Sequence, residues 1–152
     1  MIRDENTNTR SEQHVSMVKE TPKSNESPYR ILFVDDDHDI LFSIQKNLEL
    51  HGFVIDTFSN PLEALASFNP EAYHLILIDV KMPEMSGFEF YKELQKKITH
   101  GTEIKICFIT AFEIYFETLK SEFPELYSGC FIKKPINTED LLKKIKEELE
   151  MS

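Results

Sequence analysis

Short apolar runs alternate along the chain with segments in which apolar residues recur at helical spacing. Residues 30–34 (RILFV) form the first run. The helical repeat that follows consists of Ile40, Leu41, Ile44 and Leu48. Gly52 comes next, and glycine commonly ends helices. The pattern therefore predicts a strand followed by a helix.

The second unit is shorter and more polar. Residues 53–58 (FVIDTF) interleave apolar and polar side chains, as a strand at the half-exposed edge of a sheet does. Asn60, Pro61 and Glu63 then match the N-cap, N1 and N3 positions of a helix start. This helix is expected to end by residues 69–70 (Asn-Pro).

Three further apolar runs repeat the cycle. The runs are LILID (75–79), IKICFIT (104–110) and CFIK (130–133). The helical segments after them are expected to start at Ser86 with Glu89 as its capping partner, to span residues 115–123, and to open at Asn137 or Thr138. The inner faces of the first and last of these helices are expected to carry Phe90 or Tyr91, Leu94 and Ile98, and Leu142, Ile145 and Leu149.

These units predict a doubly wound α/β fold with a five-stranded parallel sheet. Four of the strands are almost entirely apolar, as expected when helices cover both faces of a sheet, whereas residues 53–58 alternate like an edge strand. Right-handed crossover connections then favour the strand order 2-1-3-4-5. Ligands of such sheets bind beyond the carboxyl ends of the strands, near the point between strands 1 and 3 where the order reverses.

The folded part is expected to be one domain spanning residues 29–152. A chain of 152 residues, 41% of them hydrophobic, has material for one full core. Residues 1–28 are rich in Asn, Thr, Ser and Glu and show no apolar periodicity. They cannot bury enough apolar surface to offset the entropy of ordering, so we expect a disordered tail.

The charge of the chain excludes some classes of partner. The formal net charge is −10, which argues against nucleic acid or an anionic membrane, since both need clustered Lys and Arg. No apolar stretch is long enough to span a membrane, and the N-terminus lacks the apolar segment of a secretory signal. We therefore expect a cytoplasmic protein.

The two cysteines, Cys107 and Cys130, each lie inside an apolar run. This placement favours buried free thiols in a reducing compartment over a disulfide framework.

Polar residues follow the four apolar strands where each strand ends. They are Asp35, Asp36 and Asp37, then Asp79, then Thr110, then Lys133, Lys134 and Pro135. Crowded carboxylates repel one another unless a divalent cation binds or their pKa values rise, and Mg²⁺ suits a site made of oxygen ligands. A lysine and a hydroxyl beside them could hold a phosphoryl group on Asp79.

Each of these residues alone has an ordinary structural explanation. An Asp after a strand usually forms a turn or caps a helix, as Asp37 or Asp39 is expected to do. Their coincidence at one edge of the sheet is what indicates a functional site.

Four short motifs contain most of these residues: VDDD (34–37), DVKMPEMSG (79–87), ITA (109–111) and KP (134–135). Together they resemble the receiver domain of two-component response regulators, which has a flavodoxin-like fold. The resemblance covers residues 29–150 and has the family's order and spacing. It implies that Asp79 is the phosphoacceptor, and that Mg²⁺ is held by Asp35, Asp36, Asp79 and the backbone carbonyl of Lys81.

The resemblance also implies roles for three residues of the last two strands. Lys134, which directly precedes Pro135, would contact the phosphoryl group, and Thr110 would donate a hydrogen bond to it. Phe131 takes the place of the aromatic switch residue, although the family commonly has Tyr there. Phe112 lies two residues past Thr110, and we hypothesise that it shields the phosphorylated aspartate from water.

A receiver of this kind accepts a phosphoryl group from phosphohistidine on a sensor histidine kinase or a histidine phosphotransfer protein. It is a signalling protein with at most slow self-dephosphorylation. Because only Met151 and Ser152 follow the region of resemblance, we expect a stand-alone receiver that signals by protein contact or by onward phosphotransfer. Aromatic residues between positions 112 and 131 could add a partner-binding face.

Two other functions stay open from the sequence. A pseudo-receiver would bind partners without being phosphorylated. A haloacid-dehalogenase-type phosphatase would use the Asp-x-Asp formed by Asp35 and Asp37, with Asp35 as nucleophile.

Overall fold

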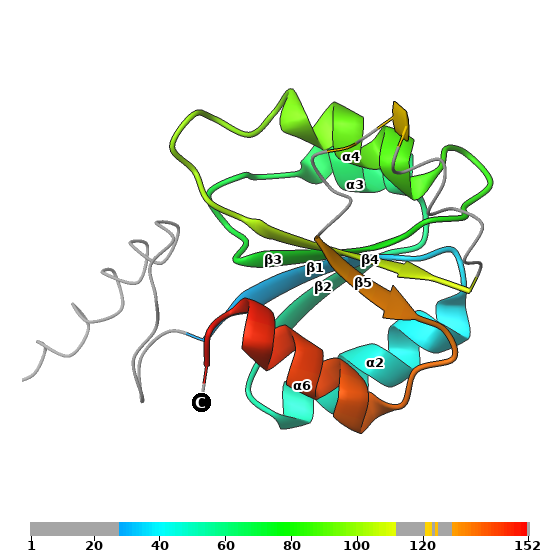
Figure 1. Ribbon diagram of the computed structural model, residues 1–152, viewed down its shortest axis with the longest axis vertical. Coiled ribbons are helices and arrows are strands. Elements are labelled where there is room, and N and C mark those ends of the chain that lie inside the picture. The colour runs from blue at the N-terminus through cyan, green and yellow to red at the C-terminus, as the bar shows by residue number, and fades with distance from the viewer. Residues whose placement is uncertain (1–27, 112–120, 123, 125–128, 152) are drawn as a thin grey trace, which may run out of the picture.

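The computed structural model describes residues 28–111, 121, 122, 124 and 129–151 (Figure 1). Outside these residues lie almost all of the expected N-terminal tail, most of the expected helix over residues 115–123, and Phe112. The hypotheses about them stay predictions.

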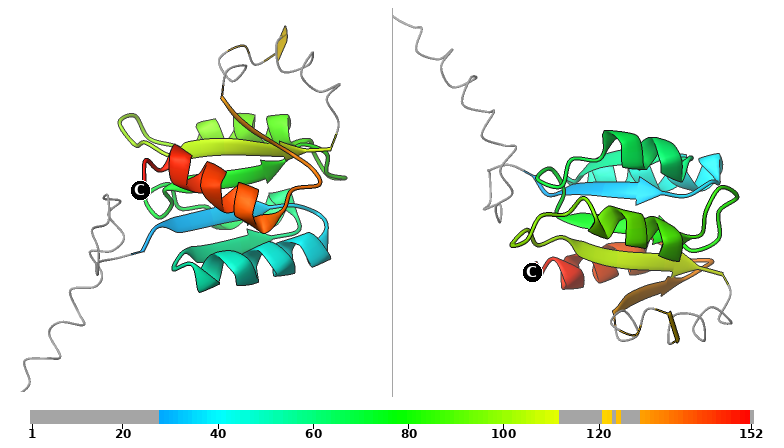
Figure 2. Two further views of the ribbon diagram at one scale, coloured as in Figure 1. Left: turned by 60° about the horizontal axis from the view of Figure 1, so that its bottom comes forward. Right: turned by 90° about the horizontal axis from the view of Figure 1, so that it is seen from above.

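Five parallel strands form one sheet with the order β2-β1-β3-β4-β5. The strands are β1 (Arg30–Val34), β2 (Val54–Phe58), β3 (Leu75–Asp79), β4 (Lys105–Thr110) and β5 (Cys130–Lys133). Figure 2 shows their arrowheads at one common edge of the sheet. The predicted fold class and strand order are confirmed.

Helices cover both faces of this sheet in the described part of the chain. They are α2 (His38–Leu50), α3 (Pro61–Ser67), α4 (Gly87–Gln95) and α6 (Thr138–Glu148). Figure 1 shows α3 and α4 above the sheet and α2 and α6 below it. None of the helices described is long and apolar enough to cross a bilayer.

Polar caps fix where the helices begin, as the sequence predicts. Asp37 caps α2 by accepting hydrogen bonds from the backbone N–H groups of residues 39 and 40. Asn60 caps α3, and Ser86 forms a capping box with Glu89 at the start of α4. Asn137 caps α6. These side chains satisfy backbone donors that would otherwise have no partner.

Two apolar layers enclose the sheet, and alternate residues of the inner strands supply them. In β1, Ile31 and Phe33 face the layer under α2 and α6, whereas Leu32 and Val34 face the layer under α3 and α4. This two-sided burial is why the inner strands read as continuous apolar runs.

The inner faces of two helices differ in part from expectation. In α6, Leu141 and Ile145 are buried, whereas the expected Leu142 and Leu149 are only half-buried and flank them. Residues four apart lie on the same face of a helix, so Leu141 and Ile145 centre the stripe. Ile98 lies beyond the end of α4 and is half-buried.

The expectation of free thiols is wrong, because Cys107 and Cys130 form a disulfide. Both side chains are buried, as expected. The register of β4 and β5 places the two residues opposite each other, with their Cα atoms 4.6 Å apart. This separation lies within the usual range for disulfides. Burial in separate apolar runs says nothing about this register, which only the pairing of the strands provides.

Candidate functional site

The carboxyl ends of the two central strands bring three carboxylates together. Val34 and Ile78 are register partners in β1 and β3, so the residues that follow them, Asp35 and Asp79, are neighbours. Carboxylate oxygens of Asp35, Asp36 and Asp79 all lie within 4.8 Å of one another. Asp35 and Asp79 are buried, whereas Asp36 is exposed. The cluster is thus rooted in the sheet and open on one side.

Lys134 reaches this cluster from the end of β5. Its Nζ lies 3.0 Å from Oδ2 of Asp35 and 3.3 Å from Oδ1 of Asp79. The backbone N–H of Lys134 donates to the carbonyl oxygen of Thr110 at 2.8 Å, which extends the β4–β5 pairing and aims the side chain inward. Lys133, one residue earlier, is exposed. The choice of Lys134 over its neighbour agrees with this geometry.

Burial and charge change the proton affinity of both partners. Burial is the main reason that the pKa of Asp79 is raised to about 7, and the negative charge of Asp35 adds to it, although Lys134 opposes the shift. Burial alone would lower the pKa of the Lys134 ammonium, but the carboxylates of Asp35 and Asp79 outweigh burial and raise it. Lys134 therefore stays charged, while Asp79 without a bound cation titrates near neutrality.

One oxygen of Asp35 fits a cation ligand. Oδ1 of Asp35 accepts a hydrogen bond of 2.9 Å from the backbone N–H of Asp37. Oδ2 is buried and, despite the Lys134 ammonium nearby, accepts no well-aligned hydrogen bond from the described residues. A buried oxygen with a spare lone pair, beside two further carboxylates, suits a hard cation such as Mg²⁺. Lys81 follows Asp79 by two residues and its side chain is exposed.

Gly87 allows the loop after β3 to close tightly against the strand. Its N–H donates to the carbonyl oxygen of Val80 at 2.7 Å, at the start of α4. A side chain at Gly87 would collide with the carbonyl oxygen of Asp79 and with the backbone of Val80. Lack of space, rather than an unusual backbone angle, requires glycine here. The loop in turn holds Asp79 at the edge of the sheet.

Thr110 and Phe131 lie on the adjacent strands β4 and β5. Thr110 ends β4 and is buried. Phe131 is half-buried and stacks on Phe108, its register partner in β4, with ring centroids 5.6 Å apart. The sequence analysis missed this stack, and it missed the hydrogen bond by which Asp37 orients Asp35. Both depend on which residues face each other after folding.

Comparisons with known proteins agree with this arrangement. Residues 31–146 match the family model described as the response regulator receiver domain. The chain is 34% identical over 123 residues to a CpxR homolog, a transcriptional regulatory protein of Haemophilus influenzae, covering 81% of this chain and 51% of that relative. The chain thus spans about half the length of this curated relative.

Two solved structures share the fold. A CheY-like receiver domain protein from Methanospirillum hungatei is 34% identical, with a TM-score of 0.70 over 82% of this chain and 95% of that one. The response regulator TrrA from Thermotoga maritima, in complex with Mg²⁺ and BeF, is 33% identical, with a TM-score of 0.64 over 78% of this chain and 97% of that one. The chain therefore belongs to the response regulator receiver family of two-component signalling.

Proposed function

We propose that this receiver is phosphorylated on Asp79 by a protein phosphohistidine in a Mg²⁺-dependent reaction. The observation that carries the proposal is the convergence of three carboxylates and the Lys134 ammonium on one edge of the sheet. The donor is a sensor histidine kinase or a histidine phosphotransfer protein. The signal leaves by contact with a downstream protein or by onward phosphotransfer, in the cytoplasm.

Asp79 supplies the nucleophile. One of its carboxylate oxygens bonds to phosphorus while the nitrogen–phosphorus bond of the donor breaks, and the electron pair returns to the imidazole. The carboxylate must be ionised to attack, and the nearby Lys134 lowers a pKa that burial raises. The product is an acyl phosphate on a strand end that the fold holds in place.

The remaining residues of the site stabilise the transferred group. Asp35, Asp36, Asp79 and the Lys81 carbonyl would hold Mg²⁺, which supplies positive charge for the phosphoryl oxygens when bound. Lys134, already within 3.3 Å of Asp79, neutralises a further oxygen. Thr110, at the end of the adjacent strand, donates its hydroxyl to another. In this proposal the chain is not an enzyme for an external substrate. The one reaction it catalyses after phosphorylation is the slow hydrolysis of its own acyl phosphate.

The same residues connect the site to a surface. Movement of Thr110 toward the phosphoryl group opens space next to β5, into which Phe131 can turn. Because Phe131 stacks on Phe108, this rotation must slide or break the stack. The position of the Phe131 ring then reports phosphorylation to a partner.

Acetyl phosphate with Mg²⁺ tests the proposal, with intact mass as the readout. Wild-type protein is expected to gain one phosphoryl group, and Asp79→Asn to gain none. Asp37→Asn is a matched control, because Asp37 caps α2 and asparagine keeps that cap. This variant is expected to be labelled like the wild type. Label on Asp35 would support the phosphatase alternative instead, and no label on any variant would support the pseudo-receiver.

A further inference from the structure

The Cys107–Cys130 disulfide lies outside the phosphoacceptor site. It joins β4 to β5 on the face of the sheet covered by α2 and α6. β5 is an edge strand of four residues, and β4 is its partner in the sheet. The bond therefore fixes the least extensively paired strand of the sheet to its neighbour.

The bond lies directly behind the aromatic stack. Phe108 and Phe131 are the next residues of the same two strands, and they pair on the opposite face of the sheet. Lys134 lies four residues after Cys130 in the sequence. A covalent link at this position constrains the strand that carries both Phe131 and Lys134.

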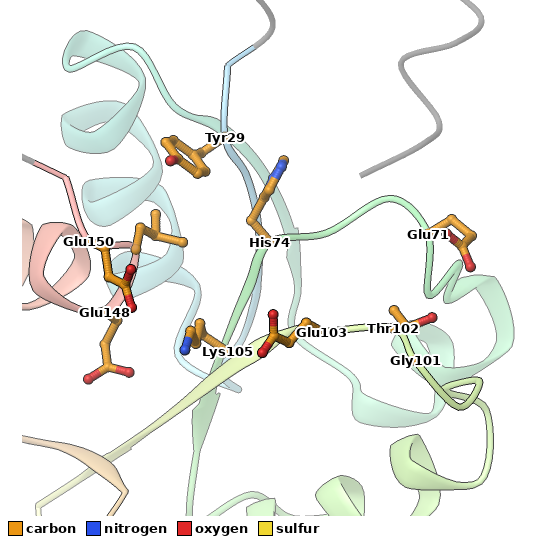
Figure 3. A pocket seen from close by; sticks show the side chains of 10 residues that line it. Tyr29, Glu71, His74, Gly101, Thr102, Glu103, Lys105, Glu148 and Glu150 are labelled. Carbon is orange, nitrogen blue, oxygen red and sulfur yellow. The ribbon is translucent and has the colours of Figure 1, made fainter. Parts of the chain in front are cut away.

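A cavity of about 480 Å³ lies at the opposite end of the sheet from Asp79 and shares one residue, Glu148, with the surroundings of the disulfide. Glu148 lines this cavity, and its carboxylate lies within 4.8 Å of both cysteine sulfurs. Lys105 also lines it, two residues before Cys107 and so on the same face of β4. Figure 3 shows Glu148, Glu150 and Lys105 on the same side of the cavity. Of the two cysteines, Cys130 is 6% exposed and Cys107 is fully buried, so Cys130 is the more accessible.

We propose that Cys107 and Cys130 form a reversible thiol–disulfide site whose reactants are small uncharged or cationic thiols and their disulfides. A thiolate attacks the Cys130 sulfur, forms a mixed disulfide and releases Cys107 as a thiolate. A second thiolate then attacks the small-molecule sulfur of the mixed disulfide. This step releases Cys130 as a thiolate and forms the disulfide of the two small molecules. The two cysteines gain two electrons and take up the two protons that the reactant thiols gave up.

The charge of the cavity selects the reactant. Four of its lining residues are acidic, namely Glu71, Glu103, Glu148 and Glu150, while Lys105 is basic. An anionic thiol is repelled on approach and a cationic one is attracted, by an amount that falls with ionic strength. In the cytoplasm, the compartment proposed above, disulfides are commonly redox-sensing rather than structural, which agrees with a reversible bond here.

The reduction rate of the native chain of 152 residues tests the site. Cysteamine is a cationic probe and 2-mercaptoethanesulfonate an anionic one, compared at equal thiolate concentration, with loss of the disulfide followed by thiol titration and intact mass. At low salt the cationic probe is expected to react about three- to tenfold faster, and the ratio should shrink at high salt. Glu148→Gln should lower the ratio. Glu147→Gln, which removes the same charge from an exposed residue outside this cavity, should leave it unchanged.

Three results would overturn the proposal. The first is that both cysteines of the reduced protein stay free thiols after exposure to cystamine. The second is a disulfide that is reduced only once the protein is unfolded. The third is an equal effect of Glu148→Gln and Glu147→Gln on the ratio of rates.

The consequence for signalling rests on the proposed function. Reduction frees β5, so the reduced chain and the Cys107→Ser/Cys130→Ser variant should show faster amide hydrogen exchange in β5 and faster labelling by acetyl phosphate than the oxidised chain. Equal exchange and labelling in both redox states would refute this coupling. If no state is labelled at all, the phosphorylation proposal fails, while the thiol titration still decides the redox site.

Discussion

Replacing Asp79 by asparagine should stabilise the cation-free protein, and the gain should depend on pH. Burial, reinforced by the charge of Asp35, raises the pKa of Asp79 from 3.8 to about 7 in the folded state. The pKa of Asp79 is higher in the folded state than in the unfolded state, so the protonated carboxyl stabilises the folded state. This contribution to the unfolding free energy is fully present below pH 3.8. The contribution to the unfolding free energy is lost as pH rises through the folded pKa of about 7, and it is absent at pH 8.5. Asparagine is neutral throughout.

The magnitude follows from the size of the shift. One pKa unit corresponds to about 1.4 kcal/mol, so the wild type loses about 2.3 kcal/mol of unfolding free energy from this group between pH 5 and pH 7, and about 2.7 kcal/mol by pH 8.5. Above that range the loss levels off. The stability advantage of Asp79→Asn should therefore be about 2 to 3 kcal/mol larger at pH 8.5 than at pH 5.

Urea unfolding in EDTA at these two pH values measures the difference directly. Taking the difference between variant and wild type cancels the titration of the other groups. Asp37→Asn serves as the control, because Asp37 is exposed and its substitution should give the same difference at both values. When Mg²⁺ replaces EDTA at pH 8.5, it should stabilise the wild type. The difference in unfolding free energy between the wild type and Asp79→Asn should then become smaller. An equal gain at pH 5 and pH 8.5 would refute the reasoning that ionisation of Asp79 causes it.

Three further substitutions test other parts of the structure, each by chemical denaturation. Lys134→Ala leaves two buried carboxylates without the ammonium group beside them, so it should lower the unfolding free energy by about 2 to 3 kcal/mol at neutral pH in EDTA. An unchanged unfolding midpoint would contradict the ion-pair geometry. Gly87→Ala places a methyl group against the Asp79 carbonyl and should cost about 1 to 3 kcal/mol, whereas a stabilised protein would show that the loop has room. Tyr73→Phe removes a hydrogen bond of 2.6 Å to Asp56 and should cost about 1 to 2 kcal/mol, and no loss would mean that water replaces this partner.

The fold could be predicted because burial leaves a direct mark on the sequence. Strands covered on both faces are continuous apolar runs, and the edge strand β2 alternates, so the order of strands follows from connection rules. The helix caps at Asn60 and Ser86 could be placed because the hydrogen bonds they make are local. The convergence of Asp35 with Asp79 followed from the same rules, since parallel strands end at one edge.

Features that depend on register or on side-chain orientation could not be predicted. The disulfide required knowing that Cys107 lies opposite Cys130, and the stack of Phe131 on Phe108 required the same pairing of β4 with β5. A shift of one residue would have separated both pairs and turned them to other faces. In α6 the exact rotation of the helix decided that Leu141, rather than Leu142, is the buried residue.

Trapping the phosphorylated residue tests most directly whether Asp79 is the phosphoacceptor. Sodium borohydride reduces an aspartyl phosphate to homoserine, which peptide mass spectrometry locates. After treatment with acetyl phosphate and Mg²⁺, we predict homoserine at position 79 in the wild type, and none when EDTA replaces Mg²⁺. Homoserine at position 35, or unmodified aspartate at both positions with Mg²⁺ present, would contradict the proposed function.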